Sequence, residues 1–398
     1  MTVRAPVAFR YPLTGAIWSQ AGSAELLGDV LDELGLTRCL AVMTPSAAAD
    51  SSLVARLQAS AGGRLAVFGD VRPHTPYVVV LAAARAAREA GADGVVSVGG
   101  GTAIDTARLA ALCAAEGVTT IQQLHALRVR LGPAGPEFPT AASQALPHVA
   151  IPTTLSSAEF SDGGAATCPW SGRKELFAGP ALACRAVLVD PALACATPSR
   201  AWVVTGVRAL DHAVETILSP RSSPPVDELS RSAIVHLREA LPGALTAPGD
   251  RDVRARGQLG SWLSYFGVAA GTLGLSHAIG HQLGSRLGLG HGLASCIALP
   301  DVMRYVAPRA GGKARLIAQA FDVDEPGASD DEVAERAAAA VDALIRRLGL
   351  PRRLGEAGFG SLDTGELADA VLGDFLAGGA PGGAPPREEL VVLLESLV

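Results

Sequence analysis

Three histidines follow one another closely in a glycine-rich, apolar stretch of this chain. His277 and His281 are four residues apart, so on a helix their imidazoles project from one face. Gly288 and Gly290 let the backbone turn sharply and bring back a third imidazole, that of His291. The whole chain of 398 residues has only 8 histidines. This clustering therefore indicates a site that binds a metal ion or moves a proton, rather than hydrogen-bonded core residues.

A second chemical motif is the run Gly99–Gly100–Gly101–Thr102, which follows an apolar segment and opens a helical pattern. Without side chains, these glycines let a phosphate approach the backbone N–H groups at the positive end of a helix dipole. Asp105 is either a first-turn residue that the dipole favours or a ligand for a cofactor hydroxyl. The run is not a GxGxxG fingerprint, and a tight strand-to-helix turn also explains it.

The elements that must position these motifs differ between the two halves of the chain. Apolar runs predict strands at 39–43, 64–68, 94–98 and 148–151. Between them, helices are predicted at 24–34, 48–61, 76–90 and 102–116, and the segment 117–147 is predicted to be mostly loop. This alternation predicts an α/β domain with a parallel sheet covered by helices, over residues 1–197.

Only helices are predicted from Pro198 onward, which gives an all-helical domain over residues 198–398. Ser199 is the expected N-cap of the first. The predicted helices are 200–219, 227–241, 252–270, 272–287, 294–306, 313–321, 330–348, 363–376 and 387–397. A ligand cleft between the two domains is the expected place for function.

Composition narrows the class of partner. The chain has 33 basic and 39 acidic residues, a net charge of −6, and no basic stripe, which argues against nucleic acid. No apolar stretch is long enough for a membrane helix, and the N-terminus lacks a signal-peptide pattern, so we expect a cytoplasmic protein. The 6 cysteines form no CxxC pair and are predicted to be buried thiols, neither zinc ligands nor disulfides.

Taken together, these motifs resemble the iron-containing alcohol dehydrogenase superfamily. The resemblance rests on Gly99–Gly100–Gly101–Thr102 with Asp105, on Ile151–Pro152–Thr153–Thr154, and on the three-histidine stretch. Other segments are similar to its maleylacetate reductase branch: Thr44–Pro45, His74–Thr75–Pro76, Gly172–Arg173–Lys174 and Leu299–Pro300. The resemblance implies NADH or NADPH as cofactor, with contacts from Thr44, Gly99, Gly100, Gly101, Thr102, Asp105, Thr153 and Thr154. We also expect a small-molecule substrate and a homodimer.

Departures from the family pattern are as informative as the matches. Metal-using relatives carry Asp-x-x-x-His on the first helix of the second domain, whereas this chain keeps His212 but has Arg208 in the carboxylate's place. A guanidinium that never deprotonates repels a cation, so we predict that no metal is bound. Asp211 points about 100° away from His212 around the helix and is not expected to substitute. Ala158 and Arg108 also replace a usual serine and lysine.

These observations favour a metal-independent NAD(P)H-dependent reductase of a small carbonyl or enone. Arg208, His212, His277 and His291 would hold the developing oxyanion by charged hydrogen bonds, and His281 would supply the proton. Alternatively, Arg208 only fills the cavity and ties down Asp211 or a backbone carbonyl.

Other functions stay open from the sequence. They are a metal-dependent alcohol dehydrogenase, a redox-neutral lyase or cyclase on the related dehydroquinate synthase-like scaffold, and a non-catalytic binding protein. Arg208, Arg173 and Lys174 would favour an anionic substrate, although solvation at the surface also explains the last two. Pro45 stands where many relatives have an acid that binds the adenosine ribose, which removes a barrier to a 2′-phosphate.

Overall fold

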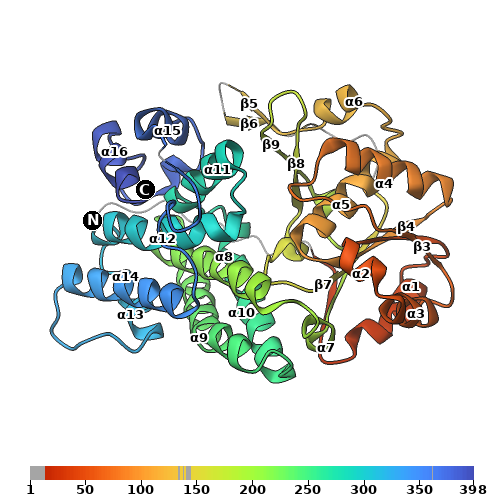
Figure 1. The fold of residues 1–398 in the computed structure, drawn as a ribbon, viewed down its shortest axis with the longest axis horizontal. Helices are drawn as coiled ribbons and strands as arrows, with labels where there is room; N and C mark the ends of the chain where they lie inside the picture. Colours follow the sequence, from red (N-terminus) through yellow and green to blue (C-terminus); the bar gives the residue numbers. More distant parts are fainter. Residues whose placement is uncertain (1–13, 133–134, 138, 140–144, 361) are drawn as a thin grey trace. The chain divides into compact units, whose positions relative to one another are not determined.

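The computed structural model describes residues 14–132, 135–137, 139, 145–360 and 362–398. The chain divides into two compact units, one ending at Thr197 and the other beginning at Pro198 (Figure 1). Each unit has its own secondary-structure class.

Six parallel strands form the sheet of the first unit, in the order β1-β10-β7-β4-β2-β3. Side chains alternate between the faces of β2, so Leu40 and Val42 pack with α4 and α5, whereas Cys39, Ala41 and Met43 pack toward α1 and α3. The predicted parallel α/β domain is confirmed. The strands are β1 (Ala16–Ser19), β2 (Cys39–Met43), β3 (Leu65–Phe68), β4 (Gly94–Gly99), β7 (His148–Pro152) and β10 (Ala186–Val189).

The helices of this unit follow the predicted order with some differences in bounds. The expected helix at 24–34 begins as the 3-10 turn Ser23–Leu26. The expected helix at 48–61 is split, because the Asp50 carboxylate accepts the N–H groups of Ser52 and Leu53 and so caps a new helix. The helices are α1 (Leu27–Glu33), α2 (Pro45–Ala49), α3 (Ser51–Ser60), α4 (Tyr77–Glu89), α5 (Gly101–Ala115), α6 (Ile121–Ala126) and α7 (Pro191–Ala194).

The prediction that 117–147 is mostly loop is wrong for its described part. Thr120 and Gln123 form a capping box that starts α6. The strands β5 (Arg130–Gly132) and β6 (Gly135–Glu137) then form a short antiparallel pair. A second antiparallel hairpin, β8 (Gly163–Thr167) and β9 (Lys174–Ala178), was not predicted. Elements of three to six residues are too short for periodicity to reveal.

The described part of the second unit contains helices and no strand, as predicted (Figure 1). Ser199 is not the N-cap of α8: Pro198 is, and the Ser199 hydroxyl donates to the carbonyl of Ala244 instead. The helices are α8 (Ser199–Leu218), α9 (Pro224–Thr246), α10 (Arg251–Ala269), α11 (Leu275–Leu287), α12 (His291–Val306), α13 (Ala314–Ala320), α14 (Asp330–Arg347), α15 (Thr364–Leu372) and α16 (Arg387–Glu395). Among the described helices, none combines the length and the apolarity needed to cross a membrane.

Candidate active site

The glycine run lies where β4 ends and α5 begins. Met43, Val98 and Ile151 are neighbours across the adjacent parallel strands β2, β4 and β7. The residues after them therefore emerge at one edge of the sheet: the Thr44 N–H donates to the Val98 carbonyl, and the Thr153 N–H donates to Gly99. Strands that are remote in sequence thus bring together Thr44, the glycines and Thr153, which were predicted to bind the cofactor.

Because the three glycines have no side chains, this edge forms a cradle of backbone N–H groups. A Cβ added to Gly100 would lie 2.8 Å from the Thr154 hydroxyl oxygen, and one added to Gly99, whose φ is +148°, would lie 2.6 Å from Thr44 Cγ2. Gly100 is the N-cap of α5 and provides no side-chain hydrogen bond, and Thr102 lies in the first turn. The Thr154 hydroxyl is buried and has no hydrogen-bond partner among the described residues. Such a cradle at a helix N-terminus fits a phosphate group.

Asp105 and Arg108, one turn further along α5, face the β8–β9 hairpin. The Asp105 carboxylate accepts the N–H of Ala165 at 3.3 Å and lies 3.5 Å from Arg108 Nη1. Burial raises the pKa of Asp105. These contacts hold Asp105 against the hairpin, and its predicted role in binding a cofactor hydroxyl stays a prediction. Arg108 is 1% exposed and donates to four backbone carbonyls, those of Ala158, Ser161, Gly163 and Leu182.

In the helical unit, α8 presents four polar residues toward α11 and α12: Arg208, Asp211, His212 and Glu215. Glu215 accepts the N–H groups of Gly274 and Ser276, at 2.8 and 2.6 Å, and so caps the N-terminus of α11. The same carboxylate lies 2.6 Å from Nδ1 of His277. Because a carboxylate is favoured at the positive end of a helix, this contact fixes α11 and its first histidine against α8.

The histidines lie in two pairs. The rings of His212 and His277 stack with centroids 5.1 Å apart, and both side chains are buried. His281 lies edge-on to His291, the first residue of α12, with centroids 6.0 Å apart. His281 is 37% exposed, and its Nδ1 lies 2.9 Å from the Asp374 carboxylate. One pair is therefore enclosed and the other reaches water.

Arg208 extends from α8 to both neighbouring helices. Its Nη1 donates to the Ser295 hydroxyl of α12 at 3.2 Å and lies 3.8 Å from the Asp211 carboxylate. A Cβ added to Gly280 of α11 would lie 3.7 Å from the same Nη1. Gly280 follows His277 by three residues, so the guanidinium lies beside the part of α11 that carries His277, whose pKa its charge lowers in addition to burial.

Asp211, which was not expected to substitute for the missing carboxylate ligand, nevertheless lies close to His277. Its carboxylate lies 3.7 Å from Nδ1 of His277 and accepts the hydroxyl protons of Ser276 and Ser295. Asp211 follows Arg208 by three residues, so the two side chains share a helix surface even though Asp211 is rotated from His212.

The electrostatics of the cluster bear on the predicted oxyanion site. Burial lowers the pKa of His212 and His277 well below 6.5, and the charge of Arg208 lowers each further. Both rings are therefore neutral at neutral pH, so a hydrogen bond from either ring to an oxyanion would come from a neutral imidazole N–H. Burial raises the pKa of Asp211 and Glu215, and each carboxyl also feels the positive charge of Arg208. The fixed positive charge of the cluster belongs to Arg208.

Sequence reasoning missed Glu215 and Asp374. Glu215 follows His212 by three residues and shares its helix surface, so this spacing was an available signal. Asp374 lies beyond the end of α15, and nothing in the local sequence connects it with His281.

Comparisons with known proteins agree with this architecture. Residues 14–191 match the model of the iron-containing alcohol dehydrogenase family, and residues 202–398 match the C-terminal model of the same family. The chain is 30% identical to lactaldehyde reductase of Escherichia coli over 380 residues, which cover 94% of this chain and 96% of that protein. It is 28% identical to a maleylacetate reductase of Pseudomonas, covering 79% and 80%. The crystal structure of maleylacetate reductase from Agrobacterium tumefaciens superposes with a TM-score of 0.78 at 26% identity, covering 99% and 98%.

Proposed function

The chain belongs to the iron-containing alcohol dehydrogenase family and is an NAD(P)-dependent oxidoreductase, and we propose that it reduces a small carbonyl or enone without a catalytic metal ion. The main supporting observation is the guanidinium of Arg208, which lies beside Gly280 of α11 and donates one hydrogen bond, to Ser295 of α12. Family membership argues against a redox-neutral lyase and against a non-catalytic binding protein.

The donor set around Arg208 does not fit the divalent cation that the family name implies. Arg208 offers no lone pair, and its charge lowers the pKa of both His212 and His277. The same field that opposes a proton on these imidazoles opposes a cation bound between them. The side chains of the cluster must therefore stabilise the substrate oxygen themselves.

The cradle around Gly100 fits the nicotinamide cofactor, with the pyrophosphate at the N-terminus of α5 and the Thr154 hydroxyl as an added donor. When bound, the reduced cofactor supplies a hydride to the substrate carbon. The chain must then stabilise the negative charge left on the substrate oxygen and provide a proton.

Arg208 supplies the charge. Within the described residues it makes one hydrogen bond, to Ser295, so most of its five N–H donors remain for a substrate oxygen. His277 turns Nδ1 toward Glu215 and keeps Nε2, which is buried and has no partner among the described residues. Because the pKa of Glu215 is raised, their shared proton can reside on the carboxyl, and Nε2 then donates to the same oxygen.

His281 supplies the proton. Its Nδ1 lies 2.9 Å from the Asp374 carboxylate, which orients the ring, and its partly exposed side chain can exchange a proton with water. Burial acts to raise the pKa of Asp374, but the hydrogen bond from His281 and its positive charge lower it overall. Asp374 therefore stays ionised and orients His281 throughout.

A second candidate is a metal-dependent alcohol dehydrogenase. Asp211, Glu215 and His277 each place a ligand atom within 4.8 Å of the others. However, backbone N–H groups already donate to Glu215 and serine hydroxyls donate to Asp211. A cation would have to displace these donors.

The deciding experiment is Arg208→Ala, assayed by reduced-cofactor consumption with lactaldehyde, maleylacetate and related small carbonyls. We expect kcat to fall roughly 10²–10³-fold, as for the loss of one oxyanion donor. Arg208→Lys keeps the positive charge but loses the planar guanidinium, so its kcat should lie between those of wild type and Arg208→Ala. Arg304→Ala is the matched control, since its guanidinium pairs with Glu335 on the exposed side of α12. Near wild-type turnover by Arg208→Ala would remove Arg208 from the mechanism.

Metal independence has its own measurement. Dialysis against chelator should leave kcat unchanged, and added Fe²⁺ or Zn²⁺ should not raise it. Arg208→Asp restores the Asp-x-x-x-His pattern and should gain metal binding. Activity that disappears with chelator and returns only with one metal would establish the second candidate, and Asp211→Asn should then abolish it.

A further inference from the structure

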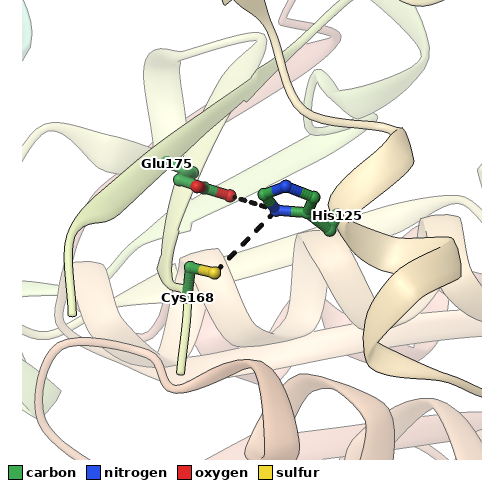
Figure 2. A group of neighbouring side chains, drawn as sticks. All are labelled: His125, Cys168 and Glu175. Carbon is green, nitrogen blue, oxygen red and sulfur yellow. Dashed lines mark hydrogen bonds and ion pairs between the residues drawn. The ribbon is translucent and has the colours of Figure 1, made fainter. Parts of the chain in front are cut away.

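Three ligand-forming side chains of the first unit converge on one point that the proposed reaction does not use. They are His125 of α6, Cys168 directly after β8, and Glu175 of β9, and their ligand atoms lie within 4.8 Å of one another (Figure 2). Nδ1 of His125 lies 2.9 Å from Glu175 Oε2 and 3.8 Å from the Cys168 sulfur. We propose that this cluster binds one thiophilic divalent cation of the Zn²⁺ class.

The hairpin register explains how two of the ligands meet. Glu175 pairs with Ala166, and Cys168 follows Ala166 by two residues, so both point to the same face of the hairpin. The Cys168 N–H donates to the carbonyl of Arg173, which continues the pairing past the strand end. The sequence has no CxxC spacing, so its cysteines were not predicted to be zinc ligands. Here antiparallel pairing, rather than close spacing in the sequence, brings Cys168 and Glu175 together.

The geometry suits a tetrahedral ion. Bonds of about 2.3 Å to sulfur and about 2.0–2.1 Å to nitrogen place those two ligand atoms about 3.6 Å apart. The observed separation of His125 Nδ1 and the Cys168 sulfur is close to this value. The Glu175 oxygen must move outward by roughly half an ångström. Thiolate with imidazole selects Zn²⁺ over Mg²⁺ or Ca²⁺, and water would complete the fourth position.

The surroundings hold the ligands and allow access. The Tyr77 hydroxyl donates to Glu175 Oε2, as a partner that orients a liganding carboxylate would. The side chain of His125 is 27% exposed and that of Glu175 is 16% exposed, so an ion can enter from their side. Arg128 lies 3.8 Å from Glu175, and its charge opposes the ion. However, Arg128 also donates to the carbonyl of His125, which keeps it at the edge of the cluster.

Metal-free protein titrated with Co²⁺ tests the proposal. Thiolate ligation gives a near-ultraviolet sulfur-to-cobalt charge-transfer band, which the histidine cluster of α8 and α11 would not produce, because its ligand-forming residues include no cysteine. We expect one Co²⁺ per chain with this band, displaced by Zn²⁺. Cys168→Ser should abolish the band, and Cys195→Ser, which removes another thiol of the same unit, should keep it.

His125→Ala and Glu175→Gln should weaken Co²⁺ binding at least tenfold while Cys168 stays in place, so the test does not depend on the folding of one variant. Bound Zn²⁺ should also slow tryptic cleavage after Arg173 and Lys174 by fixing the hairpin. Absence of the band at saturating Co²⁺, or its persistence in Cys168→Ser, would overturn the proposal and leave His125 and Glu175 as a hydrogen-bonded pair.

Discussion

Each unit of this protein encloses an arginine among polar partners, and the two arginines differ in how many donors remain. Arg108 is 1% exposed and gives hydrogen bonds to four backbone carbonyls around the β8–β9 hairpin. Arg208 has a side chain that is 13% exposed and gives one hydrogen bond among the described residues, to Ser295. Burial lowers the pKa of Arg208, although the group stays charged at any physiological pH.

This difference separates an arginine that stabilises the fold from one that can bind a ligand. A guanidinium whose donors all point at carbonyls is a fixed part of the fold and has nothing to offer a ligand. A guanidinium with unused donors beside neutral imidazoles keeps its electrostatic effect for whatever enters.

The largest effect should come from Arg108→Ala. It leaves one buried and three partly buried carbonyls without a donor, at about 1 kcal/mol or more each, so we expect stability to fall by roughly 4 kcal/mol. The Tm should drop by roughly 10 °C. Arg56→Ala, which removes a surface ion pair with Glu25, should cost less than about 1 kcal/mol. If Arg108→Ala and Arg56→Ala have the same Tm, the hydrogen bonds of Arg108 do not stabilise the unit.

A smaller effect on stability should appear at Glu159. The charge of Arg108 acts to lower the pKa of this acid but does not offset the effect of burial. Burial raises its pKa from 4.5 to about 7, and its Oε2 has no partner among the described residues. Because the folded state holds this proton more tightly than the unfolded state, the resulting stabilisation is complete below about pH 4.5 and is lost as the pH rises through about 7.

Glu159→Gln removes that ionisation. The variant should match wild type near pH 4 and exceed it by up to about 3 kcal/mol near pH 8, measured by denaturant unfolding at both values. Glu89→Gln, on the exposed side of α4, should show no such difference. A wild-type advantage at the higher pH would mean that the charge of Arg108 is available after all.

The smallest effect concerns ligand binding in the first unit and leaves both arginines intact. Gly100→Val places side-chain atoms against Thr154 in the cradle, so we expect the Kd for NADH or NADPH to rise at least about tenfold, or 1.4 kcal/mol. Fluorescence titration measures this. Gly360→Val, at an exposed glycine with open space around it, is the control. Unchanged affinity in Gly100→Val would place the pyrophosphate elsewhere.

Local sequence patterns determined the class of each unit and the existence of both motifs. Apolar strands alternating with helices predicted the parallel sheet, and the glycine run marked the start of α5. The spacing of His277 and His281 predicted their common helix face. These inferences hold because strand alternation, helical periodicity and glycine's backbone freedom depend on neighbours within a few residues.

The tertiary structure alone decided what the polar groups do. Asp211 lies beside His277, although the sequence did not indicate this contact, and Asp374 reaches His281 from another segment. A hairpin that the sequence did not reveal brings Cys168 to His125 of α6. The sequence alone also does not show that the donors of Arg108 are occupied whereas most of those of Arg208 are not. Whether a guanidinium is saturated, and whether an imidazole is neutral, depends on burial and on partners supplied by distant segments, which only packing brings together.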